Sequence, residues 1–170
     1  MDLKDTFRFV APRVRDAAVK TAAQLDRLGI RYALTGGLAV GAHGYIRTTT
    51  DVDFLVGEEA FDRQGLVVAF KAGVPIEVDG IRIDYLSPAS LGPQMEAVLD
   101  NPQLSEGLPV VPIEALIYMK LVAKRRRDLV DIIELIKTGP DLTRVRDYLK
   151  QYADDLLPLF EELVNEALSE

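Results

Sequence analysis

Apolar and polar positions follow two different patterns along the chain, and the change falls near residue 112. Before it, short apolar runs typical of strands alternate with apolar residues three or four apart, which are typical of helices. Residues 13–28 form one such helical stretch, and Gly29 ends it. After residue 112 the spacing is helical. The pattern predicts an α/β core over residues 1–111, followed by a C-terminal helical subdomain over residues 112–170.

The predicted elements of the first part are short. Strands are expected at residues 30–34, 51–56, 76–78 and 81–86, and helices at residues 38–43 and 58–71. The dipeptide Asp79-Gly80 separates the last two strands and is the strongest hairpin signal in the chain. Residues 88–109 are poorly patterned and predict one helix and a loop. In the second part, helices are expected at residues 113–124, 128–137, 142–152 and 155–168.

Composition narrows the classes of function. The 170 residues include no cysteine and one histidine, which excludes disulfide scaffolds, thiolate zinc sites and cysteine nucleophiles. The net charge of −7 argues against broad DNA binding. No apolar run reaches the length of a membrane span, and the first ten residues carry four charges, so neither a membrane segment nor a secretory signal is expected. The expectation is a cytoplasmic protein.

Three aspartates are the most informative residues chemically. Asp51 and Asp53 belong to one predicted strand, so their side chains project from the same face, about 6.6 Å apart along it. Two adjacent carboxylates repel each other unless a cation lies between them, and hard oxygen ligands suit Mg²⁺. Asp84 lies in a later strand and completes a three-carboxylate site if the two strands are neighbours. Such a site has the ligands for two metal ions, one to activate an attacking oxygen and one to steady the leaving group.

Gly36 and Gly37 fall where a predicted strand ends and a helix begins. A turn without side chains exposes backbone N–H groups, and a helix N-terminus favours anions. Phosphate beside a metal-binding carboxylate pair is the arrangement that phosphoryl or nucleotidyl transfer requires. Each feature alone has a simpler interpretation: a tight turn, a chance D-x-D pair in an acidic chain, or, for Asp84, a solvent-facing strand residue. The hypothesis depends on their order along the chain.

These residues together resemble a known signature. Gly36-Gly37, Asp51-x-Asp53 and Asp84 resemble the nucleotidyltransferase superfamily related to DNA polymerase beta. Two longer strings are similar to the branch that holds AbiEii-like toxin and aminoglycoside nucleotidyltransferases: GGxAxxxHGxxRxTxDxD over residues 36–53 and LxxMKLxAxxRxDxxD over residues 116–131. The resemblance covers roughly residues 30–137. It implies a mixed sheet flanked by helices, with Mg²⁺ and a nucleoside triphosphate at the site.

The resemblance also implies roles for individual residues. Asp51 and Asp53 would be metal ligands, and Asp84 would activate the acceptor hydroxyl. Gly36 and Gly37 would hold the triphosphate. Because Gly37 replaces a serine that many relatives use, the phosphate contact would shift to the backbone or to Thr35.

Four further features each have two interpretations. Arg47 matches phosphate geometry, or is a solvated loop residue. Lys120 is a triphosphate contact by the resemblance, or part of an exposed helix face. The resemblance places His43 at the site edge, whereas its simpler role is a contact at the end of its helix. The basic run at residues 124–127 binds RNA backbone, or forms a solvated helix junction paired with Asp128 and Asp131.

The leading hypothesis is a Mg²⁺-dependent nucleotidyltransferase that moves a nucleoside monophosphate from a triphosphate to a hydroxyl of an RNA such as tRNA, a protein or a small molecule. The alternative is a catalytically inactive antitoxin or interaction module that binds a cognate toxin or antitoxin protein. The acidic surface and an apolar stripe in the C-terminal helix motivate that alternative. A helical RNase is poorly supported, because those enzymes need an Arg…His pair in the helical segment and the single histidine is His43.

Overall fold

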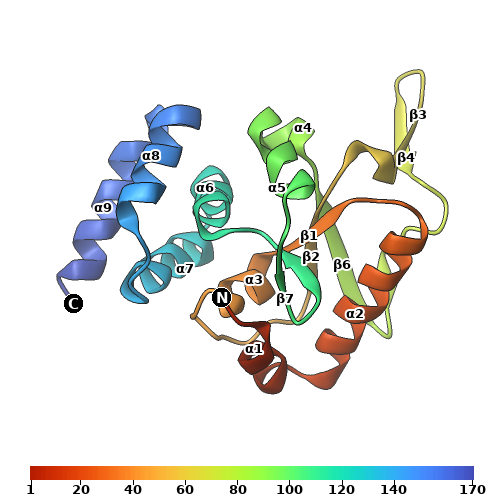
Figure 1. Ribbon diagram of the computed structural model, residues 1–170, viewed down its shortest axis with the longest axis horizontal. Coiled ribbons are helices and arrows are strands. Elements are labelled where there is room, and N and C mark those ends of the chain that lie inside the picture. Colours follow the sequence, from red (N-terminus) through yellow and green to blue (C-terminus); the bar gives the residue numbers. More distant parts are fainter.

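A six-stranded mixed sheet forms the centre of the first part of the molecule (Figure 1). The computed structural model describes residues 1–170. The strand order is β5-β6-β2-β1-β8-β7; β2 runs antiparallel to β1 and parallel to β6. The strands are β1 (Tyr32–Thr35), β2 (Val52–Val56), β5 (Glu77–Val78), β6 (Ile81–Leu86), β7 (Gln103–Ser105) and β8 (Leu108–Val110). This arrangement confirms the predicted class, a mixed sheet flanked by helices.

Helices cover this sheet because their apolar stripes match its apolar faces. The long α2 buries the predicted stripe that begins at Val14 and packs against β2, β5 and β6, whereas α5 packs against β1. The short α3 follows β1 directly and contacts both β1 and β2. The helices of this part are α1 (Leu3–Phe9), α2 (Pro12–Arg27), α3 (Gly36–Ala42), α4 (Pro88–Leu91) and α5 (Glu96–Asp100).

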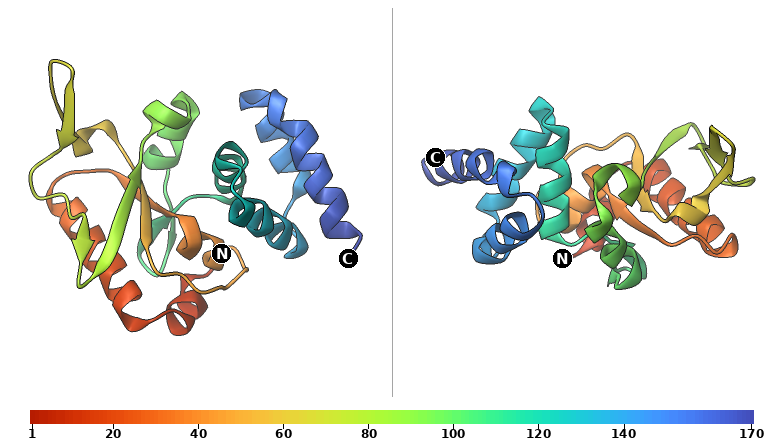
Figure 2. Two further views of the ribbon diagram at one scale, coloured as in Figure 1. Left: turned by 180° about the vertical axis from the view of Figure 1, so that it is seen from behind. Right: turned by 90° about the horizontal axis from the view of Figure 1, so that it is seen from above.

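The second part is helical and lies to one side of the sheet (Figures 1 and 2). It comprises α6 (Ile113–Ala123), α7 (Arg126–Lys137), α8 (Leu142–Tyr152) and α9 (Leu157–Leu168), which confirms the four predicted helices. The apolar stripe of α9, which includes Phe160 and Leu163, is buried, and α9 packs against α7. One cluster of 45 buried apolar residues includes side chains from the sheet and from these helices. None of the helices has the length and apolar character that crossing a membrane requires.

The helix predicted for residues 58–71 is wrong. Only Glu58–Ala60 form a short 3₁₀ helix, and the chain continues as the antiparallel hairpin β3 (Phe61–Gln64) and β4 (Val67–Phe70). Gly65 lies in the turn with a φ of 62°, a conformation that suits a turn rather than a helix. The hairpin projects from the sheet on the side away from the C-terminal helices (Figures 1 and 2).

Residues 88–109 also differ from the prediction. They form α4 and α5 and then the hairpin β7–β8, where only one helix and a loop were expected. The turn of this hairpin is Glu106-Gly107, and both residues have positive φ. Strands of three residues are too short to show an alternating pattern, which explains why β8 is not recognisable although it pairs with the central β1.

Candidate active site

The pairing of β2 with β6 brings the three aspartates together. The register sets Asp53 directly opposite Asp84 in the parallel pair, and Asp51 immediately precedes β2. Alternation along β2 buries Val52 and Phe54 beneath the sheet, so the aspartates project from the opposite face. The condition stated for a three-carboxylate site, that the two strands are neighbours, is therefore met.

These aspartates line a polar cavity of about 770 Å³. The cavity lies where the end of β1 and the beginning of β2 meet α6 and the beginning of α7. No hydrophobic side chain lines it, and its charged residues are five basic and four acidic: Arg47, Arg82, Lys120, Arg125, Arg127, Asp51, Asp53, Asp84 and Asp128. A chain of net charge −7 thus concentrates basic groups around its aspartates, which is the electrostatic setting for an anionic ligand bound with a cation.

Asp53 is the most perturbed carboxyl of the cavity. Its burial, followed by the neighbouring charges of Asp84 and Asp51, raises its pKa to about 6. Lys120 and Arg125 act against this shift without cancelling it. A carboxylate in this environment gains most from a bound cation, because the cation offsets both the desolvation and the repulsion.

Gly36 and Gly37 are required by close approaches at the edge of this cavity. Gly36 has a φ of 62°, and a Cβ built there would lie 2.1 Å from Oδ2 of Asp53. A Cβ on Gly37 would lie 2.4 Å from Oγ1 of Thr49 and 3.1 Å from a guanidinium nitrogen of Arg47. Because neither position carries a side chain, the turn between β1 and α3 passes directly beside Asp53 and beside the loop that holds Arg47 and Thr49.

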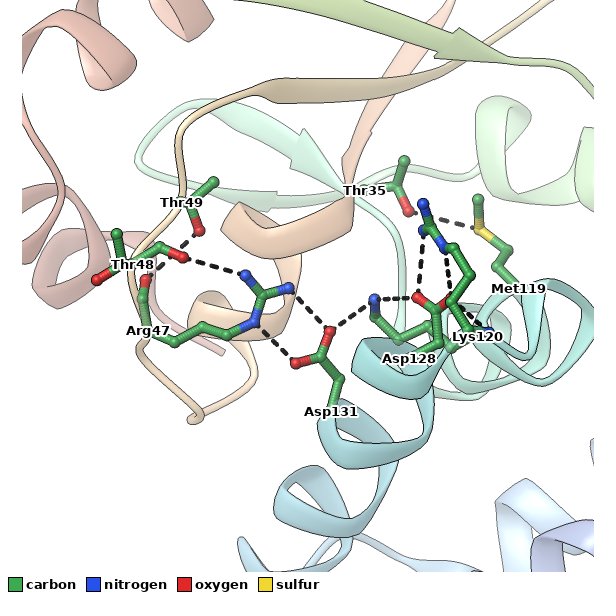
Figure 3. A network of polar contacts seen from close by, with 9 residues as sticks. Thr35, Arg47, Thr48, Thr49, Met119, Lys120, Asp128 and Asp131 are labelled. Atoms are coloured by element: carbon green, nitrogen blue, oxygen red, sulfur yellow. Dashed lines mark hydrogen bonds and ion pairs between the residues drawn. The ribbon is translucent and has the colours of Figure 1, made fainter.

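A network of charges is built around the buried carboxylates of Asp128 and Asp131 (Figure 3). Arg47 donates to both carboxylate oxygens of Asp131 at 2.8 Å, and Nζ of Lys120 lies 2.8 Å from Asp131 and 3.1 Å from Asp128. Arg125 donates to both oxygens of Asp128. Burial alone would raise the pKa of Asp128, but the bonds from Arg125 and the charge of Lys120 hold the pKa below its ordinary value.

Among the predicted phosphate contacts, the network involves Arg47 and Lys120. Both line the cavity and both are paired with acids of α7, so neither is a free cation. The network holds three cations and two carboxylates, which leaves one positive charge unbalanced. Through these ion pairs the network also joins the loop before β2 to α6 and α7.

Two predicted residues lie elsewhere. The hydroxyl of Thr35 is buried and donates to the sulfur of Met119, and Thr35 is not among the residues that line the cavity. His43 is at the C-terminal end of α3, where its Nε2 is 2.8 Å from the carbonyl of Val111 and burial lowers its pKa. It lines a separate cavity of about 240 Å³. The histidine thus lies at the end of its helix and away from the aspartates, but its burial disfavours the positive charge on which the simpler role depends.

Sequence reasoning missed three arginines of the cavity. Arg125 and Arg127 belong to the basic run at residues 124–127, and Arg82 precedes Asp84 by two positions on β6. The basic run is evident in the sequence, but a run of charged residues is equally typical of a solvated helix junction. The alternation of β6 was a signal for Arg82, because residues two apart on a strand share a face.

The guanidinium of Arg82 bridges two of the aspartates. It lies 3.3 Å from Asp51 and 3.1 Å from Asp84. With the side chains in this arrangement, no group of three or more His, Cys, Asp or Glu side chains is close enough to hold a metal ion. The donor set nevertheless fits Mg²⁺, which takes one or two protein carboxylates and completes its shell with water and phosphate oxygens.

No family model and no curated protein matches the chain. A similar solved structure is the crystal structure of an antigenic nucleotidyltransferase-like protein from Paracoccidioides brasiliensis. It is 17% identical, the match covers 89% of this chain and 93% of that chain, and the TM-score is 0.44. At these values the similarity carries no argument about function, which depends here on the cavity alone.

Proposed function

We propose that the protein is a Mg²⁺-dependent nucleotidyltransferase that transfers a nucleoside monophosphate from a nucleoside triphosphate to a hydroxyl acceptor. The observation that carries the proposal is the placement of Asp51, Asp53 and Asp84 at one end of two paired strands, inside a cavity lined by five basic side chains. This reaction has two requirements: carboxylates that hold a cation, and neighbouring groups that hold phosphate.

The chain's own groups divide these tasks. Asp51 and Asp53 would hold the metal ion, which when bound neutralises phosphate charge and favours attack at phosphorus. Arg127 lines the cavity and has no ion-pair partner, so it is the side chain most available to triphosphate oxygens. Arg125, immediately before α7, pairs with Asp128 but remains 75% exposed. Lys120 and Arg47 add positive charge from a fixed position, because the acids of α7 hold them in place.

Asp84 would act on the acceptor. Its side chain is partly exposed at the cavity, whereas Asp53 is more enclosed, so an incoming hydroxyl reaches Asp84 more easily. The acceptor oxygen forms a bond to the α-phosphorus, the bond between that phosphorus and the bridging oxygen breaks, and pyrophosphate leaves. Asp84 takes the proton of the hydroxyl.

The test is a calorimetric titration of ATP, CTP, GTP and UTP into the full-length protein, with and without Mg²⁺. We expect binding that depends on Mg²⁺ in the wild type and is lost in an Asp51→Asn/Asp53→Asn variant. Asp62→Asn is the matched control, because Asp62 is an exposed aspartate of β3 outside the cavity. Its binding should equal that of the wild type.

Failure of this titration would favour the alternative, an inactive scaffold that binds a partner protein. One motivation for that alternative is weaker in the folded protein, because the apolar stripe of α9 is buried against α7 rather than available to a partner. If no triphosphate binds with or without Mg²⁺, the nucleotidyltransferase proposal is overturned.

A further inference from the structure

The guanidinium of Arg82 lies between Asp51, a proposed metal ligand, and Asp84, the proposed base. Its Nη2 is 3.3 Å from Oδ2 of Asp51 and 3.1 Å from Oδ2 of Asp84, and its Nε donates to the same oxygen of Asp84 at 3.2 Å. No other basic side chain forms an ion pair with either carboxylate. Arg82 therefore supplies the positive charge that two neighbouring carboxylates require.

The strand itself places Arg82 there. Arg82 and Asp84 are two residues apart on β6 and share a face, and the pairing of Val52 with Ile83 sets the preceding residues, Asp51 and Arg82, side by side. The side chain of Arg82 is 67% exposed, so packing does not hold it in this position. The ion pairs and hydrogen bonds to Asp51 and Asp84 are what hold it, and a competing cation removes their acceptors.

We propose that the guanidinium of Arg82 occupies the carboxylate of Asp51 when no metal ion is bound, and that it must leave this carboxylate before the metal ion binds. This inference rests on the proposed function. β5 sets Glu77 opposite Arg82 in the antiparallel pair, so a displaced guanidinium has another carboxylate nearby. A cation already bound to a triphosphate brings additional contacts to the cavity and therefore displaces Arg82 more readily than the free cation.

The test measures binding of Mn²⁺ alone to the metal-free, full-length protein, by electron paramagnetic resonance of the free ion and by calorimetry. We expect Arg82→Gln to bind Mn²⁺ about tenfold more tightly than the wild type, because the competing state is removed. Arg82→Lys should fall between the two, because it keeps the charge but loses the fork that contacts both carboxylates.

Arg127→Gln is the matched control. Arg127 lines the same cavity but pairs with no carboxylate, so its removal reports the general effect of one charge fewer, which we expect to be about twofold. Equal tightening in Arg82→Gln and Arg127→Gln would overturn the inference, as would an unchanged affinity in Arg82→Gln. A readout independent of metal is the melting temperature without metal, which should fall in Arg82→Gln and recover when Asp51→Asn is added.

The outcomes separate this inference from the proposed function. If both the wild type and Arg82→Gln bind Mn²⁺ with equal affinity, the inference fails and the proposed function stands. If only Arg82→Gln binds Mn²⁺ alone, the inference holds, and the proposed function is decided separately by the triphosphate titration with Mg²⁺, because a metal ion bound to a triphosphate displaces Arg82 more readily than the free ion. If neither protein binds Mn²⁺ alone, the inference fails, and the triphosphate titration with Mg²⁺ again decides the proposed function.

Discussion

At the scale of single residues, Asp53 couples the charge of the cavity to pH. Its pKa of about 6 in the folded protein exceeds the ordinary value of 3.8, so the folded chain keeps a proton that the unfolded chain has lost between these values. The free energy of unfolding contributed by Asp53 is therefore largest below pH 4 and falls as pH rises to about 6, by at most about 3 kcal/mol.

Asp53→Asn should remove this pH dependence. We expect the metal-free variant to be more stable than the wild type at pH 7.5 and to lose that advantage at pH 4, as measured by urea unfolding at both values. Asp62→Asn serves as the control for a change of charge at an exposed site. A difference between Asp53→Asn and the wild type that does not vary with pH would contradict the raised pKa.

Gly36 makes a second prediction at this scale. Gly36→Ala combines a positive φ with a Cβ that would lie 2.1 Å from Asp53, whereas Gly139→Ala has a positive φ of 84° and nothing within 4 Å. Both variants carry the backbone strain, so their difference isolates the close contact. We expect Gly36→Ala to lose about 2 kcal/mol more free energy of unfolding than Gly139→Ala. Equal losses would mean that the aspartate moves aside without cost.

At the scale of elements, the buried network joins the loop before β2 to α6 and α7. Asp131 is 1% exposed and is held by Arg47 and Lys120, so Asp131→Asn leaves two cations without their shared partner. We expect a loss of about 3–5 kcal/mol in the free energy of unfolding. Glu134→Gln on the same helix removes an exposed ion pair with Lys137 and should change it by about 0.5 kcal/mol or less. Similar losses in the two variants would contradict the structural role of the network.

The same scale explains which parts of the fold were predictable. The long helices and the Asp79-Gly80 hairpin follow from local pattern, and the two aspartates of β2 from strand alternation. The partner of an ion pair is not a local property: nothing in the sequence joins Arg47 to Asp131, which lie 84 positions apart. The hairpin β3–β4 was misread because Val67 and Phe70 are apolar yet exposed, so their spacing carried no information about a buried face.

At the scale of the whole molecule, the sheet and the C-terminal helices share one apolar core. Seven consecutive residues of α6 are buried, and this helix lies between α3 and α7–α8. We therefore expect one cooperative unfolding transition in differential scanning calorimetry, coincident with the loss of helix followed by circular dichroism. Two separated transitions would show that the helical part unfolds independently.

The hairpin β3–β4 has a practical consequence that concerns protein engineering. Its tip, Gly65-Leu66, is open on every side: Leu66 is fully exposed, and a Cβ on Gly65 would meet nothing within 4 Å. The hairpin lies in the connection between β2 and β6 but outside their sheet. Extra sequence inserted at this tip, such as an affinity tag or a fluorescent reporter, would leave the spacing of Asp53 and Asp84 untouched. The tip is thus a permissive position for attaching cargo or a surface anchor away from the residues that line the cavity.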